Sequence, residues 1–71
     1  MPFVTKDGYI VEVGTWLYDG TEIREVTEID INKGIVYAHD IKYDENGNEY
    51  VDETKTSMIT RYEVGRMYAK W

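Results

Sequence analysis

The sequence predicts a mainly β fold, a small antiparallel meander that curls into an open barrel. Two observations predict it: short runs rich in Val, Ile, Thr and Tyr alternate apolar with polar positions, and turn signals separate these runs at intervals of roughly eight to twelve residues. With 71 residues and one proline, the chain is predicted to form a single domain over residues 1–71. A chain this short buries only about 60% of its unfolded surface, so we expect a thin margin of stability.

The first third of the chain is predicted to contain a strand and a hairpin. Residues 9–13 alternate between two flanking glycines, which is typical of a short strand. Residues 15–18 and 21–23 flank the dipeptide Asp19-Gly20, which suits a tight turn with positive φ. We therefore expect these two segments to pair.

The middle of the chain is predicted to continue the meander. Apolar positions in residues 23–31 are first three and later two residues apart, which indicates either a short helix or a β-bulge. Val, Thr and Ile dominate there, which favours the bulged strand. Asn32-Lys33-Gly34 suits a three-residue hairpin loop, and the next strand is predicted over Ile35–Tyr43. Asn46-Gly47 predicts a further turn, with residues 49–52 as the returning strand.

The C-terminal stretch, residues 56–71, fits two kinds of element. Met58 and Thr60 begin an alternating pattern that is typical of a strand, whereas Ser57 is a good cap for a short helix. Gly65 is expected to interrupt either element. The sequence leaves strand and helix open in this stretch.

Residues 13–20 read Val-Gly-Thr-Trp-Leu-Tyr-Asp-Gly. This segment resembles the opening of SH3-like barrels, in which a strand leads through a glycine to an aromatic residue. The resemblance rests on these eight residues and implies an SH3-like open barrel. It bears on the fold alone, because one fold hosts many activities.

Acidic residues dominate the charge of the chain. Fourteen Asp and Glu face eight Lys and Arg, which gives a formal net charge of −6. Six of the acids lie in residues 40–53, where Lys42 is the only base, and a second acidic group occupies residues 19–30 around Arg24. Such a field attracts basic proteins or metal ions and repels nucleic acid and anionic membranes. Neither direct nucleic-acid binding nor membrane binding is predicted.

Composition also limits the expected cellular compartment and oligomeric state of the chain. The absence of cysteine excludes disulfides and thiolate metal sites, so the cytoplasm is the expected location. No apolar run approaches the ~18 residues of a spanning helix, and the first six residues lack the pattern of a secretory signal. Seven Tyr, two Trp and one Phe supply area for a core or an interface, which leaves a homodimer open.

Few side chains suit catalysis. His39 is the one histidine and Ser57 the one serine, and no base can be assigned to a nucleophile. The chain is therefore predicted not to be an enzyme, with no catalytic residue and no cofactor. His39 shares a strand face with Ile35 and Ile41, which predicts an imidazole at the edge of the core. Carboxylate pairs on so short a chain are interpreted as surface groups rather than as a glycosidase pair.

Residues 42–53 approach the EF-hand pattern. With Gly47 at loop position six, Asp44 falls at position three and Glu53 at position twelve. Lys42 would then occupy position one, where a ligating oxygen is required. A polar hairpin loop explains the same residues, so no metal ligand is predicted.

The acidic clusters are the main functional lead. In composition and layout the whole chain resembles the small acidic host-takeover proteins of bacteriophages, several of which are DNA mimics that inhibit bacterial DNA-binding proteins such as the nucleoid protein HU. The resemblance implies a non-enzymatic inhibitor whose acidic surface binds a basic DNA-binding protein in the host cytoplasm. The clustering itself supplies the candidate partner-binding residues: Asp40, Asp44, Glu45, Glu49, Asp52 and Glu53, then Glu22, Glu25 and Glu28, with Tyr43 and Tyr50 beside the loop.

An alternative function remains open on the sequence. In it the chain is an SH3-like adaptor or a phage structural module that binds through an aromatic surface. That surface would contain Trp16, Tyr18, Tyr68 and Trp71. The two hypotheses differ in salt dependence, because screening weakens a charged interface far more than an aromatic one.

Overall fold

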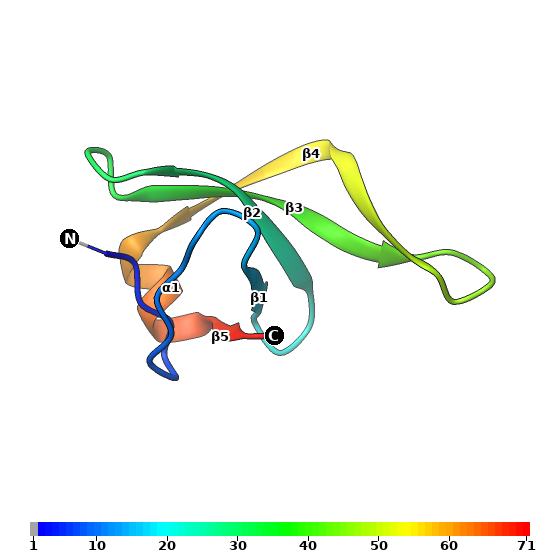
Figure 1. The fold of residues 1–71 in the computed structure, drawn as a ribbon, viewed down its shortest axis with the longest axis horizontal. Helices are drawn as coiled ribbons and strands as arrows, with labels where there is room; N and C mark the ends of the chain where they lie inside the picture. The colour runs from blue at the N-terminus through cyan, green and yellow to red at the C-terminus, as the bar shows by residue number, and fades with distance from the viewer. Residues whose placement is uncertain (1) are drawn as a thin grey trace.

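Five antiparallel strands form one open sheet in the order β4-β3-β2-β1-β5, and one short helix precedes the last strand (Figure 1). The computed structural model describes residues 2–71. The predicted mainly β meander is confirmed, and the structure contains the short C-terminal helix that the sequence left open. The elements are β1 (Trp16–Tyr18), β2 (Ile23–Asp30), β3 (Ile35–Tyr43), β4 (Glu49–Thr60), α1 (Arg61–Met67) and β5 (Ala69–Lys70).

The hairpin turns lie where the sequence predicts them. Asp19 Oδ1 accepts the backbone N–H groups of Thr21 and Glu22 at 2.9 and 2.7 Å, which closes the turn between β1 and β2. The loop between β2 and β3 ends at Gly34, whose φ of 68° favours glycine. The strand β3 has its predicted bounds, and a register shift within β2 confirms the predicted bulge.

The prediction of a strand over residues 9–13 is wrong. This segment forms an isolated bridge between Val4 and Ile10 instead of a continuous ladder. The N–H of Val11 donates to the carbonyl of Phe3 at 2.8 Å, and both of these side chains are buried. Alternation misleads here because Tyr9 and Val13, which alternate with the buried Val11, are 52% and 65% exposed, so the apolar positions do not line a buried sheet face.

The C-terminal stretch contains both elements that the sequence left open. The strand β4 continues to Thr60, and Thr60 itself caps α1. Its hydroxyl accepts the N–H of Glu63 at 3.2 Å, and the Glu63 carboxylate accepts the N–H of Thr60 at 3.0 Å, which forms a capping box. Ser57, the predicted cap, lies within β4 opposite Ala38. The expected interruption at Gly65 is also wrong, because Gly65 lies inside α1.

Replacing Thr60 with alanine should lower the free energy of unfolding by about 1 kcal/mol, because the helix loses its N-cap. For a domain of this size that corresponds to a melting temperature lower by roughly 4–8 °C. The matched control is Ser57→Ala, which removes the hydroxyl that the sequence suggested as the cap. Thermal denaturation followed by circular dichroism should leave Ser57→Ala near the parent. Equal losses in both variants would contradict the assignment of Thr60 as the cap.

The main core lies on the side of the sheet that faces α1 and the N-terminal segment (Figure 1). We call this side the core face, and it carries Val36 and Ala38 of β3, both fully buried. Because side chains alternate along a strand, Ile41 projects from the opposite face, where it pairs with Ile23 and is also buried. The residues of the main cluster are Phe3, Val11, Leu17, Val26, Val36, Ala38, Ile59, Val64 and Tyr68.

Candidate interaction surface

The distal halves of β3 and β4 form an arm that extends beyond the rest of the molecule (Figure 1). We define the arm as residues 40–53. Residues 42–50 are exposed without interruption. The turn at its tip is closed by Asp44, whose Oδ1 accepts the N–H groups of Asn46 and Asn48, each at 2.9 Å. The hairpin therefore holds the acids near its tip away from the core.

The acids of the arm differ in how far their charge is already neutralised. Within residues 2–71, two arm acids form ion pairs: Asp40 with Arg24 at 2.9 Å, and Asp52 with Lys42 at 4.0 Å. The other four arm acids are exposed and lie outside these pairs, namely Asp44, Glu45, Glu49 and Glu53. These four carboxylates are the part of the predicted site that is most available to a basic partner.

Arg24 joins three distant segments at the edge of the core. Its Nε donates to Asp40 at 2.9 Å, and its NH1 donates to Asp19 at 3.1 Å and to the Tyr68 hydroxyl at 2.8 Å. The side chains of Arg24, Asp19 and Asp40 are each about four-fifths buried, at 18%, 19% and 21% exposure. Sequence reasoning missed this role for Arg24. The signal was present in the hairpin register, which places Arg24 opposite Asp40.

The ionisation of this cluster follows from its burial and its hydrogen bonds. Partial burial opposes ionisation of Asp19, but the N–H groups of Glu22 and Thr21 and the guanidinium of Arg24 outweigh it, so the pKa of Asp19 is lowered. Burial raises the pKa of the Tyr68 phenol, and the neighbouring Arg24 offsets part of that rise. Asp19 is therefore ionised and Tyr68 neutral at pH 7.

Replacing Asp19 with asparagine should reduce the dependence of stability on acid pH. A carboxyl whose folded pKa is lowered adds stability above its ordinary pKa of 3.8, and this contribution is lost as the pH falls through the folded value. The difference in unfolding free energy between the parent and Asp19→Asn should thus shrink as the pH falls below 3.8. Urea titrations at several pH values measure it. A difference that stays constant with pH would contradict the lowered pKa.

A bulge larger than the ordinary two-residue kind interrupts β4 at the base of the arm. Residues 53–56 of β4 lie opposite His39 alone, between the pairs Asp40↔Asp52 and Ala38↔Ser57. Asp52 Oδ1 accepts the N–H and the hydroxyl of Thr54, and the hydroxyl bond is the main reason that the pKa of Asp52 is lowered. The bend of β4 at this point is visible in Figure 1. It sets the direction in which the arm leaves the sheet.

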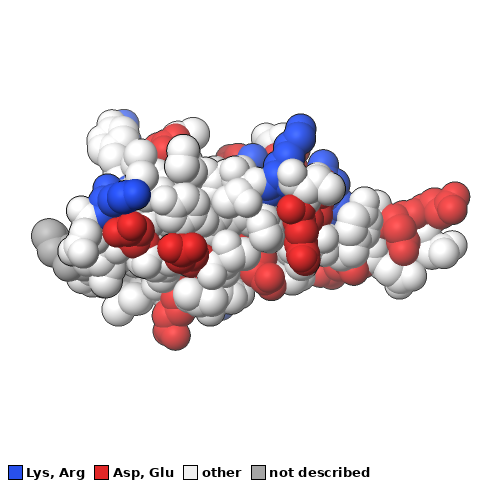
Figure 2. All heavy atoms as spheres, turned by 90° about the horizontal axis from the view of Figure 1, so that it is seen from above, with Lys and Arg blue, Asp and Glu red and all other residues white. Residues whose placement is uncertain are grey.

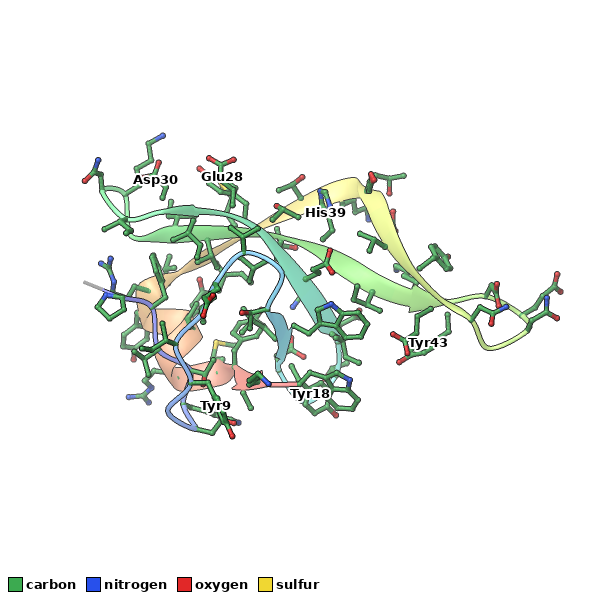
Figure 3. All side chains as sticks on the ribbon, viewed as in Figure 1. Tyr9, Tyr18, Glu28, Asp30, His39 and Tyr43 are labelled. Carbon is green, nitrogen blue, oxygen red and sulfur yellow. The ribbon has the colours of Figure 1, made fainter. Side chains whose placement is uncertain are left out.

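The predicted acidic residues do not share one face. Asp40 and Asp52 face each other on the core side, whereas Glu49 pairs with Tyr43 on the opposite side. Glu25 and Glu28 of β2 also lie on that opposite side, across from His39 and Tyr37. Figure 3 shows Glu28, Asp30 and His39 projecting from the same side of the sheet. In Figure 2, acidic atoms occupy the end of the arm and form separate groups elsewhere, with Lys and Arg between them.

Four of the predicted residues differ in their surroundings. Tyr43 and Tyr50 are 52% and 49% exposed and lie on opposite faces of the arm, because Tyr50 pairs with Lys42. The carboxylate of Glu25 accepts the indole N–H of Trp16 at 2.9 Å, so part of its hydrogen-bonding capacity is already used. Glu22 lies in the turn before β2 and is half-buried.

The four residues of the alternative aromatic surface are divided by the sheet. Tyr68 belongs to the core and is only 6% exposed. Trp16 and Tyr18 project from the opposite face, and the ring of Trp71 contacts that of Tyr18 at a centroid distance of 4.8 Å. Trp71 is 58% exposed. What the structure brings together is therefore the pair Tyr18 and Trp71.

The residues considered for chemistry are held in the strands. The Nε2 of His39 lies 3.2 Å from the hydroxyl of Thr56, and Ser57 pairs with Ala38 on β4. Residues 2–71 enclose no pocket, and they contain no cluster of three His, Asp or Glu placed to hold a metal ion. No helix among these residues is long and apolar enough to cross a membrane.

No family model, no curated protein and no solved structure matches the chain. The SH3-like barrel and the resemblance to phage host-takeover proteins therefore stay predictions.

Proposed function

We propose that the protein is a non-enzymatic inhibitor that binds a basic, normally DNA-binding protein through the acids of the arm. The observation that carries the proposal is the placement of Asp44, Glu45, Glu49 and Glu53, four exposed carboxylates on an extended hairpin, outside the ion pairs of the arm. A basic surface that accommodates phosphates also attracts such a group of carboxylates. The proposal places the protein in the cytoplasm of a bacterial host, with a phage origin.

The spacing of these acids limits how closely the arm copies DNA. Residues on one face of a strand are separated by about 6.6 Å, which is two rises of about 3.3 Å. One strand of DNA carries a phosphate for every 3.4 Å or so of helix axis and has a condensed layer of counterions. We therefore expect the affinity of the arm for its partner to fall with salt less steeply than the affinity of duplex DNA for the same protein.

The test is capture of proteins from bacterial lysate on the immobilised chain at low salt, repeated with excess duplex DNA and again at high salt, with mass spectrometry of what is bound. We expect a basic DNA-binding protein that both DNA and salt displace. Capture of proteins without a DNA-binding function, unaffected by DNA, would contradict the proposal.

The ring pair of half-buried Tyr18 and exposed Trp71 supports a second candidate, an adaptor or phage structural module that binds through aromatic contact. Its binding should survive high salt, because it buries ring surface rather than charge. Replacing Trp71 with alanine should then abolish capture, whereas under the first proposal Trp71→Ala leaves capture intact.

A further inference from the structure

The outer edge of β4 is free along the arm. In the sheet order β4 is a terminal strand, with β3 as its one neighbour in the ladder. At the tip the N–H of Asp44 donates to the carbonyl of Asn48 at 2.9 Å, so these two residues form a hydrogen-bonded pair. Bonded and non-bonded pairs alternate along an antiparallel ladder. Tyr50 and Asp52 therefore direct their N–H and C=O groups to β3, and Glu49 and Val51 direct theirs away from it.

This edge can accept another strand. Backbone N–H and C=O groups that point outward from a terminal strand are a template for β-strand addition. Glu49 is exposed and Val51 is 37% exposed, and the described residues contain no further strand beyond β4. The regular ladder ends at the pair Asp40↔Asp52, so the template reaches no further than Glu53, the first residue of the bulge.

Charge selects the strand that can occupy this edge. Residues 49–53 read Glu-Tyr-Val-Asp-Glu and contain three acids and no base. A second copy paired antiparallel about Val51 would place Glu49 opposite Glu53, and like charges directly opposite each other destabilise a sheet. Two copies joined at this edge in any register would bring six carboxylates together. A strand with basic side chains would be stabilised by attraction to these carboxylates, whereas a second copy would be destabilised by repulsion from them.

We propose that the β4 edge at residues 49–53 binds one extended, basic segment of the partner by antiparallel strand addition. This inference rests on the proposed function and adds to it the way in which the partner is held. The side chains of residues 49–53 define the sequence of this segment. It should have basic residues opposite Glu49, Asp52 and Glu53, a β-branched residue opposite Val51 and an aromatic residue opposite Tyr50. Read along the partner, the pattern is basic, basic, β-branched, aromatic, basic.

The test is a titration of the isotope-labelled chain with the peptide Thr-Lys-Lys-Val-Tyr-Lys-Thr, followed by amide NMR. The amide protons of Glu49 and Val51 should move downfield and gain protection from hydrogen exchange, since they acquire hydrogen bonds. Those of Tyr50 and Asp52, which already bond to β3, should change much less. This alternation is a signature that attraction between charges alone would not produce.

A matched peptide separates strand addition from charge. Replacing the central valine of the peptide with proline keeps the net charge and removes the N–H that would bond to the carbonyl of Val51. We expect this peptide to bind at least about tenfold more weakly, the loss that corresponds to about 1.4 kcal/mol for its missing backbone bonds. Equal binding of the two peptides, or no binding of either, would overturn the inference.

The chain itself offers a second variant. Val51→Pro removes the outward N–H at the edge and cuts no bond to β3, a position at which a strand tolerates proline. It should weaken binding of the valine peptide at least about tenfold, with the fold checked by circular dichroism. If Val51→Pro still captures the basic DNA-binding protein with the affinity of the parent, the edge inference is wrong and the proposed function stands. If the parent captures none, the proposed function itself is wrong.

Discussion

Reversing Glu45, Glu49 and Glu53 to lysine should weaken binding of the basic partner at least about a hundredfold. Each reversal changes the charge by two units, so the three together take the formal net charge from −6 to 0. Placing like charges against a basic surface costs several kcal/mol, and about 2.8 kcal/mol already corresponds to a hundredfold. Isothermal titration or surface plasmon resonance with the captured protein measures the loss.

The choice of these three acids separates binding from folding. Asp44 closes the turn and Asp52 organises the bulge, so both are left in place. Glu12 is an exposed acid on the N-terminal segment, and Glu12→Lys changes the net charge by the same two units as Glu49→Lys. If binding depends on the arm, Glu49→Lys weakens it and Glu12→Lys leaves it within about twofold, because distant exposed charges are screened. Equal effects of the two would show that net charge alone governs binding.

Replacing Arg24 with methionine should be among the most destabilising single changes in the chain. It leaves Asp19 and Asp40 without their shared cation and the Tyr68 hydroxyl without its donor. Breaking a buried pair costs about 3–5 kcal/mol, and since these side chains keep about a fifth of their surface in water we expect a loss near 3 kcal/mol. A domain of this size has a total stability of about 4–11 kcal/mol. Urea denaturation followed by tryptophan fluorescence measures the change.

The conservative control for this prediction is Arg24→Lys. Lysine keeps the positive charge but has a single nitrogen. It cannot reproduce the planar guanidinium, in which one nitrogen donates to Asp40 and another donates to both Asp19 and Tyr68. It should recover part of the loss, and the double variant Arg24→Met with Asp40→Asn should be more stable than Arg24→Met alone, since one unpaired carboxylate is removed. A melting temperature for Arg24→Met within a few degrees of the parent would contradict the assigned role of Arg24.

The hairpins could be predicted from the sequence because their turns are encoded locally. Asp19-Gly20, residues 32–34 and Asn46-Gly47 each contain a glycine with positive φ, and between them the period-two pattern of β3 fixes its bounds. The bulge in β2 could be predicted for the same reason, because the shift in apolar spacing is written in consecutive residues. These features depend on short stretches of chain.

Features that depend on pairing between distant parts of the chain could not be predicted from the sequence. The capping of α1 by Thr60 required knowing that β4 runs past Ser57, and the loop at residues 9–13 required knowing that Phe3 packs beside Val11. The split of the acids between two faces follows from the pairing of Asp52 with Asp40 and of Glu49 with Tyr43. The sequence alone does not specify which residues of two strands lie opposite each other, so these faces could not be assigned.

The most direct test of the central claim is whether the chain competes with DNA. Labelled duplex DNA is bound to the basic protein captured from lysate, the chain is added, and release of the duplex is followed by fluorescence anisotropy. We predict that the parent chain lowers the anisotropy to that of free DNA, in a saturable way that weakens with salt, and that the variant with Glu45, Glu49 and Glu53 reversed releases none. Equal release by that variant, or a complex in which the chain and the duplex are bound together, would contradict the claim.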